Sequence, residues 1–204
     1  MDIVQSVALA GGMAWASGMR LYAVLLAAGL MGRLGYLHLP ASLQVLENPL
    51  VLGIAGFLLA VEFLADKIPA VDSVWDSIHT FIRIPAGAVL AALAMGDADP
   101  SLMLAAGLLG GTLTAGTHVA KSGSRALINT SPEPFSNVAT SLGEETLVAG
   151  GLYLAMFKPV AFLVLLGIFI LLLVWFLPKL LRAAWRVFGR VLTHIFGRPD
   201  DERA

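Results

Sequence analysis

The sequence contains no cysteine and very few charged residues. The absence of cysteine excludes disulfide bonds, thiolate metal ligands and cysteine nucleophiles. Only 13% of the 204 residues are charged and 58% are hydrophobic, whereas soluble domains are about 25% charged and about 45–50% apolar. The mean hydropathy of +0.84 points the same way. The scarcity of charge therefore excludes an ordinary soluble domain and predicts an all-α integral membrane protein.

The sequence also lacks the motifs of the common enzyme classes. It contains no hydrolase nucleophile elbow, no phosphate-binding glycine loop and no zinc-protease helix. Nothing in it supports nucleic-acid binding. We therefore expect no enzyme activity, no cofactor and no nucleic-acid partner. The first apolar run starts without a basic region and continues to about Met31, which favours a retained membrane segment over a cleaved signal peptide.

Apolar runs predict about six transmembrane or re-entrant helices, because a crossing helix needs about 20 apolar residues. The runs at 84–95 and 144–157 are short, so one of them is a candidate re-entrant segment. Together they form a single membrane domain over residues 1–178. The predicted segments are Ile3–Met31, Pro49–Leu64, Ile84–Met95, Leu102–Ala120, Glu144–Phe157 and Pro159–Leu177.

The distribution of lysine and arginine predicts the orientation, because these residues gather on the cytoplasmic side. With six crossings both termini share a side. That side carries ten basic residues, against Arg33 and Lys158 on the other. We therefore expect both termini in the cytoplasm of a bacterial inner membrane. The tail 179–204 is basic and then acidic, and the apolar spacing of its first part predicts an amphipathic helix on anionic lipid. A solvated tail is the alternative.

Two short stretches with the pattern Ser-Gly-x-Arg indicate an internal repeat. The first is Ser17-Gly18-Met19-Arg20, and the second is Ser122-Gly123-Ser124-Arg125. Glu47 and Glu144 then lie at matching places ahead of an apolar run in each half. Two repeats at about 3–97 and 101–178, with three segments each, would be inverted relative to one another. Inverted repeats and broken helices are typical of secondary transporters, which have their site at the repeat interface.

The two arginines are the leading candidates for a functional site. A charge at membrane depth costs at least about 2.5–3.5 kcal/mol, so it marks a functional site or a buried ion pair. The glycine in each stretch costs about 1 kcal/mol in a helix, so we expect both helices to break there. Symmetry suggests that Arg20 faces Glu144 or Glu145, and that Arg125 faces Glu47. These pairs either hold the halves together or bind an anion at a half-helix N-terminus.

A polar stretch at residues 68–83 separates the second and third apolar runs. Its apolar residues fall on one helix face, and its charged residues fall on the opposite stripe. Three interpretations remain open: an interfacial helix with a wet acidic face, a cation, metal or proton site, or a gate that meets Arg20 or Arg125. The ion-coupling or gating candidates are Glu62, Asp66, Lys67, Asp72, Asp76, His79, Arg83 and His118.

The run Glu62-Phe-Leu-Ala-Asp-Lys-Ile-Pro, its continuation to Ala88 and the upstream Ser-Gly-Met-Arg-Leu resemble a family of small integral membrane proteins. That family is catalogued as domain of unknown function 4126, and the resemblance covers about residues 5–178. It implies a multi-span membrane protein without an assigned activity, so no catalytic residues carry over from it.

The sequence thus supports three hypotheses of different classes. The first is a transporter or channel-like protein for a small solute or ion, which we expect to be a homo-oligomer in the lipid bilayer. Its substrate or gating residues would be Ser17, Gly18, Arg20, Ser122, Gly123 and Arg125, with Glu47, Glu144 and Glu145 as counter-ions. The second is a protein that binds or translocates the phosphate of an anionic lipid or lipid carrier. The third is a membrane scaffold without transport.

Overall fold

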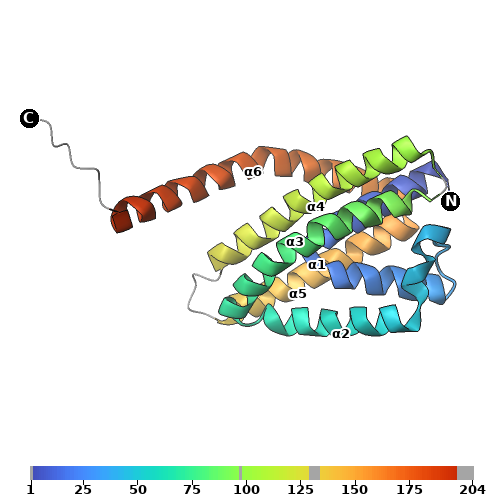
Figure 1. Cartoon of the computed structure of the whole chain (residues 1–204), viewed down its shortest axis with the longest axis horizontal. Helices are drawn as coiled ribbons and strands as arrows, with labels where there is room; N and C mark the ends of the chain where they lie inside the picture. Colours follow the sequence, from blue (N-terminus) through green and yellow to red (C-terminus); the bar gives the residue numbers. More distant parts are fainter. Residues whose placement is uncertain (1, 97, 129–133, 197–204) are drawn as a thin grey trace, which may run out of the picture.

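A computed structural model describes residues 2–96, 98–128 and 134–196, and this part of the chain is helical without strands. Five of its six α-helices begin at a proline, whose missing N–H is not needed in the first turn of a helix. The elements are α1 (Ile3–Arg33), the 3₁₀-helix η1 (Ala41–Glu47), α2 (Pro49–Ala65), α3 (Pro69–Ala94), α4 (Pro100–Ile128), α5 (Pro134–Phe157) and α6 (Pro159–Phe196) (Figure 1).

Four of the described helices are long and apolar enough to cross a membrane. They cover Ile3–Arg33, Ala70–Ala94, Pro100–Ala126 and Pro159–Lys179. The pair of η1 and α2, bent by 67° at Asn48, is a fifth candidate as one broken span. The predicted all-helical architecture is therefore confirmed, and membrane spans are supported by length and apolar composition.

Helix α1 breaks at Arg20, as the sequence predicts. Arg20 has φ −147° and ψ 81°, outside the helical region. The start of α1 and the segment that follows α1 lie at the same end of the bundle. Ile3 and Ser6 line one pocket together with His38 and Pro40, which follow the helix. Figure 1 shows the second arm running back toward the N-terminal end. Thus α1 enters the bundle, turns at Arg20 and returns.

The second predicted break is wrong, because α4 continues without interruption through Gly123 and Arg125. Both helices extend beyond the predicted segments: α4 continues past Ala120 to Ile128, and α5 begins at Pro134 instead of Glu144. The hydroxyl of Ser122 donates to the His118 carbonyl at 2.7 Å, so the helix itself satisfies this polar side chain. A glycine penalty of about 1 kcal/mol is too small to break a helix that packs along its length.

The polar stretch 68–83 and the apolar run after it form one helix, α3. Its charged stripe is buried: Asp76 is 4% exposed and Arg83 is 0% exposed. Its apolar stripe points outward, with Val74 61% and Phe81 83% exposed. Of the three interpretations of this stretch, the interfacial helix with a wet acidic face is therefore wrong. A helix with its charges inside and its apolar face outside fits a lipid environment.

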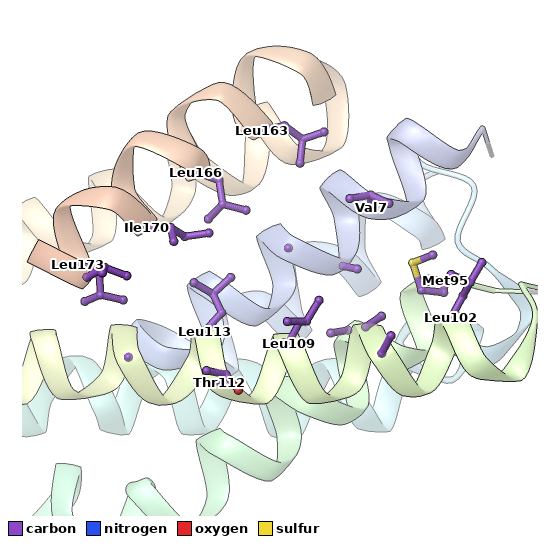
Figure 2. A pocket seen from close by; sticks show the side chains of 18 of the residues that line it. Val7, Met95, Leu102, Leu109, Thr112, Leu113, Leu163, Leu166, Ile170 and Leu173 are labelled. Atoms are coloured by element: carbon purple, nitrogen blue, oxygen red, sulfur yellow. The ribbon is translucent and has the colours of Figure 1, made fainter. Parts of the chain in front are cut away.

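Helix α6 joins the last predicted span and the tail into one helix. It diverges from the bundle toward its C-terminal end (Figure 1). Between its first half and helices α1, α3 and α4 lies an apolar groove of about 590 Å³, in which Leu166 and Ile170 face Leu109 and Leu113 (Figure 2). The side chains that would make the tail amphipathic, from residue 183 onward, lie outside the described side chains.

The directions of the helices match only part of the predicted inverted plan. Helices α2 and α5 run in opposite directions, and so do α3 and α6 (Figure 1). The first arm of α1, however, runs in the same direction as α4. The start of α1 and the end of α6 lie at opposite ends of the molecule. The prediction that both termini share the cytoplasmic side of a membrane stays a prediction.

Candidate functional site

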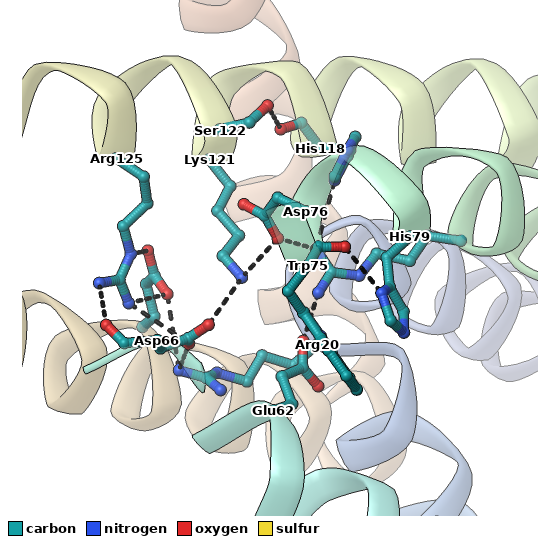
Figure 3. A network of polar contacts seen from close by, with 12 residues as sticks. Arg20, Glu62, Asp66, Trp75, Asp76, His79, His118, Lys121, Ser122 and Arg125 are labelled. Carbon is teal, nitrogen blue, oxygen red and sulfur yellow. Dashed lines mark hydrogen bonds and ion pairs between the residues drawn. The ribbon is translucent and has the colours of Figure 1, made fainter. Parts of the chain in front are cut away.

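Charged side chains from the α1–α5 region meet inside the bundle, near the end where α2 is connected to α3 (Figure 3). Each of them is at most 8% exposed, which is rare for charged residues unless they are paired. Among the described residues, the buried carboxylates outnumber the buried cations. The cluster consists of Arg20, Arg83, Lys121 and Arg125 with Glu62, Asp66, Asp72, Asp76 and Glu144. We call it the charge network.

The first half of the charge network joins the two repeat arginines to two shared carboxylates. Arg20 Nη2 lies 2.5 Å from Asp66 Oδ2 and 3.6 Å from Glu144 Oε2. Arg125 Nη2 lies 3.4 Å and 2.9 Å from the same two oxygens. Arg20 Nη2 is also 3.7 Å from Glu145 Oε1. The structure therefore confirms that Arg20 faces Glu144 and Glu145, and it adds Asp66 as the central carboxylate.

The second half of the charge network centres on Arg83 of α3. Its Nη2 donates to Glu62 Oε1, and its Nη1 donates to Asp76 Oδ1 at 2.9 Å. Lys121 Nζ lies 3.3 Å from Asp76 Oδ1 and 3.8 Å from Asp66 Oδ1. Lys121 thus connects the two halves, and a change in one half alters the field in the other.

His118 joins the charge network to the broken helix. Its Nε2 lies 2.6 Å from Thr80 Oγ1, and its Nδ1 lies 3.3 Å from both Arg83 Nη1 and the Gly18 carbonyl. Nδ1 accepts from Arg83 in one tautomer and donates to Gly18 in the other, so the two contacts are alternatives. The second partner belongs to α1 just before its break at Arg20.

His79 has a different environment, beside the network. Its Nδ1 lies 2.8 Å from the Trp75 carbonyl, which only accepts, so Nδ1 carries the hydrogen. Nε2 then accepts from the Tyr22 hydroxyl at 3.0 Å, and the indole of Trp75 stacks on the ring. Both ring nitrogens are engaged, so His79 is held in place and packs α3 against the second arm of α1.

Several buried polar atoms of the charge network have no hydrogen-bond partner among the described residues. They include Nε and Nη1 of Arg20, Oε2 of Glu62 and Oδ2 of Asp76, and Ser17 Oγ lies nearby in α1. Buried polar atoms are satisfied in the great majority of cases, because each unsatisfied one costs about 1–3 kcal/mol. The network therefore has unused hydrogen-bonding capacity on both donors and acceptors.

The close approach of α1 to α4 depends on Gly18. A Cβ at this position would lie 2.5 Å from the Thr114 carbonyl oxygen and 2.8 Å from Thr117 Cβ. Only a glycine allows this contact without a backbone shift. The Ser-Gly of the first repeat stretch thus serves packing, which in turn brings Arg20 to the network.

Some predicted site residues lie elsewhere. Glu47 is the last residue of η1, at the other end of the bundle, where its carbonyl accepts from Arg33 Nη1 at 3.1 Å. The predicted Arg125–Glu47 pair is therefore wrong. Lys67 donates to the Phe63 carbonyl at 3.0 Å between α2 and α3, and partial burial lowers the pKa of its ammonium. Ser122 and Gly123 lie on α4 beside the network without joining its ion pairs.

Sequence reasoning missed Lys121, Ser141, Thr80 and Tyr22 as partners. The predicted segment ends at Ala120, just before Lys121, although continuing the helix by two turns puts His118, Lys121 and Arg125 on one face. Ser141 Oγ accepts from Arg20 Nη2 at 3.1 Å. No spacing signal could have identified Ser141 or Tyr22, because their partners are distant in the sequence.

A polar pocket of about 240 Å³ opens beside the charge network between α3 and α4. Asp72, Asp76 and Arg125 belong both to its wall and to the network. Among the described residues, no group of three or more histidine, aspartate or glutamate side chains is arranged to hold a metal ion. The arrangement can therefore bind small ions or polar groups and relay charge, and it shows no multidentate metal centre.

The fold and the site define a class: an all-helical, membrane-type bundle with its charges inside. Within that class, the chain belongs to the family described as "Domain of unknown function (DUF4126)", whose model matches residues 7–179. This match confirms the resemblance carried by the Ser-Gly-Met-Arg and Glu-Phe-Leu-Ala-Asp-Lys stretches. No curated protein and no solved structure matches the chain significantly.

Proposed function

We propose that this protein moves a small solute or ion across a membrane, with the charge network as its site. The observation that carries the proposal is the combination of excess buried carboxylates with buried donors and acceptors that lack partners. Intramembrane ionisable residues typically mark substrate or ion pathways. Here they lie at the tip of a helix that enters the bundle and turns back, as in broken-helix transport sites.

A purely structural role explains this network less well. Replacing a buried ion pair by apolar side chains of similar volume is often neutral or stabilising by about 1–4 kcal/mol. A bundle that needed only stability would gain nothing from four cations and five carboxylates at 8% exposure or less. The excess of negative charge further favours a positively charged substrate or coupling ion, because an additional cation would reduce the repulsion.

The contacts between the two halves retain one feature of the predicted inverted repeat. The two repeat arginines come from α1 and α4, and their shared carboxylates come from the end of α2 and from α5. Each half thus contributes one arginine from its first helix and one carboxylate from its second segment. We propose that this pseudo-symmetric contact is the interface at which the halves move, with the basic end that carries Lys121 and Arg125 facing the cytoplasm.

The lipid hypothesis draws on the apolar groove beside α6, which could accommodate acyl chains (Figure 2). Its wall, however, carries no charged side chain. A lipid phosphate at Arg20 or Arg125 would also meet Asp66 and Glu144, which already bind these guanidinium groups. The charges therefore favour a cation over a phosphate as the ligand. A membrane scaffold without transport is the interpretation that absence of flux would support.

The test is flux into proteoliposomes that contain the purified full-length chain. The panel consists of protons, sodium, potassium, chloride and small organic cations, each followed with a suitable dye or tracer. We expect saturable flux of a cation in the wild type and at least a tenfold loss in Arg20→Gln and Arg125→Gln, because each removes one of the two guanidinium groups that neutralise Asp66 and Glu144. Arg33→Gln, at an exposed arginine near η1, is the matched control and should retain the flux.

Absence of flux for the whole panel would contradict the proposal, and so would full flux in both arginine variants. Size-exclusion profiles and melting temperatures of all proteins identify variants that fail to fold. Arg125→Lys keeps the charge and loses the paired contact of Nε and Nη2 with Glu144, so an intermediate flux is expected if that geometry positions the site.

A further inference from the structure

The polar pocket between α3 and α4 has a wall of hydroxyl and carboxylate groups. Ser73, Ser77 and Thr80 come from one turn after another of α3, together with Asp72 and Asp76, and Ser122 comes from α4. Its volume of about 240 Å³ suits an ion with part of its water shell or a small organic group. The outer hydroxyls are exposed, whereas Asp76 at the inner wall is buried.

The hydroxyl groups of the wall present acceptors. Ser77 Oγ donates to the Ser73 carbonyl at 2.7 Å, Thr80 Oγ1 donates to the Asp76 carbonyl at 2.9 Å, and Ser122 Oγ donates to the His118 carbonyl at 2.7 Å. A hydroxyl has one hydrogen and two lone pairs. Because each of these hydrogens is used inside its own helix, only lone pairs remain, and Thr80 Oγ1 also lies 2.6 Å from His118 Nε2. The hydroxyls of Ser77 and Ser122 are therefore the better ligands.

The nearby cations leave one carboxylate oxygen unused. Arg83 Nη1 and Lys121 Nζ both contact Oδ1 of Asp76. Oδ2 of Asp76 is buried and has no hydrogen-bond partner among the described residues, and the residue is 4% exposed. Arg125 at the other side of the pocket is held by Glu144 and Asp66. Asp76 thus contributes a carboxylate with one unpaired oxygen to the wall of the pocket, and the hydroxyls of Ser77 and Ser122 contribute lone pairs.

We propose that this pocket binds one monovalent cation, an alkali-metal ion or a primary ammonium group, between Asp76 and the hydroxyls of Ser77 and Ser122. Hard oxygen ligands suit such cations. A single charge fits the site, because the described residues offer no set of three acidic or histidine ligands for a multivalent metal. The inference rests on the proposed function, for which it names the substrate or coupling ion as a monovalent cation.

Binding is tested on the purified full-length protein in detergent, at constant ionic strength. Sodium, potassium and methylammonium chloride are titrated separately against choline chloride, and the melting temperature is followed. We expect one of the small cations to raise the melting temperature along a saturable curve, since a ligand that binds only the folded state stabilises it. Sodium or potassium identifies an alkali-metal site, and methylammonium identifies an ammonium site.

Three variants make the assignment specific. Asp76→Asn should abolish the cation-dependent shift. Ser122→Ala leaves every ion pair in place and should weaken apparent affinity by about tenfold, the equivalent of one charge-assisted hydrogen bond. Asp99→Asn is the matched control: Asp99 is exposed and caps the start of α4 through Ser101, a role that asparagine also fills. It should bind like the wild type.

The proposal is overturned if all cations, choline included, act alike on the wild type, or if Asp76→Asn and Ser122→Ala both keep the full shift. Should Asp76→Asn fail to fold, Ser122→Ala alone decides. Flux in proteoliposomes without a cation-dependent shift would refute this pocket while leaving the transport function standing. A cation-dependent shift without flux would retain the site and refute transport.

Discussion

Arg83 illustrates how this chain keeps a charge away from water. The side chain is fully buried, and two carboxylates from different helices, Glu62 and Asp76, bind its guanidinium group. The sequence places Asp76 on the same helical stripe as Arg83, but it carries no signal for Glu62, which comes from α2. The sequence marks these charged residues as notable because charge is rare in the chain. Their partners, in contrast, depend on how α2, α3 and α4 pack.

A double-mutant cycle on Glu62 and Arg83 tests this coupling. Glu62→Gln or Arg83→Met alone should cost about 3–5 kcal/mol of unfolding free energy, because Arg83→Met leaves the buried Glu62 without its cation and Glu62→Gln removes one of the two carboxylates that bind Arg83. The double variant Glu62→Gln/Arg83→Met should cost less than the sum of the two. The measurement is the free energy of unfolding in mixed detergent micelles. Strictly additive costs would show that the two side chains do not interact.

At the scale of the elements, apolar runs located most helices well, since α2 begins at the predicted Pro49 and α6 at the predicted Pro159. The errors concern polar segments. The predicted segments exclude the stretch 68–83 and stop at Ala120, because charged residues are expected to face water. In the structure these charges turn inward and the helices α3 and α4 continue through them. The full lengths of α3 and α4 therefore depend on an apolar stripe along each helix that faces lipid. Overall composition does not show such a stripe.

The packing of α1 on α4 provides a prediction at this scale. Gly18→Ala places a Cβ within 2.5 Å of a backbone oxygen of α4, so α1 must shift and carry Arg20 away from Asp66. We expect a loss of about 1–3 kcal/mol in stability, typical of overpacking, and a loss of flux. The matched control is Gly143→Ala in α5, where no atom lies within 4 Å of the added Cβ.

Gly143→Ala should be neutral or slightly stabilising, because alanine is the better helix former. Melting temperatures of both variants in the same detergent decide the outcome. If Gly18→Ala is as stable as Gly143→Ala and transports normally, the close contact between the two helices does not position the network.

The whole molecule combines a buried charge network with an apolar exterior. Large apolar side chains such as Phe57, Phe81, Leu171 and Trp175 are between 64% and 83% exposed. In water such a surface would promote aggregation, whereas in lipid it costs nothing. The sequence predicted this class from composition. It could not predict that α1 turns back, because a 31-residue apolar helix satisfies the length of a full crossing.

Cysteine labelling in membranes tests the account most directly, since every functional inference requires that the charges lie inside a lipid-embedded bundle. The chain has no cysteine, so single substitutions give a clean signal. Ile3→Cys, Tyr36→Cys, Ile68→Cys and Phe81→Cys are treated with a membrane-impermeant maleimide from each side, and all four positions are exposed.

The account predicts that positions 3 and 36 react from one side and position 68 from the other. Position 81 should stay unreactive until detergent removes the lipid. Labelling of positions 3 and 36 from opposite sides would contradict the return of α1. Rapid labelling of position 81 in intact membranes would place the apolar stripe of α3 in water and contradict the transport site built on it.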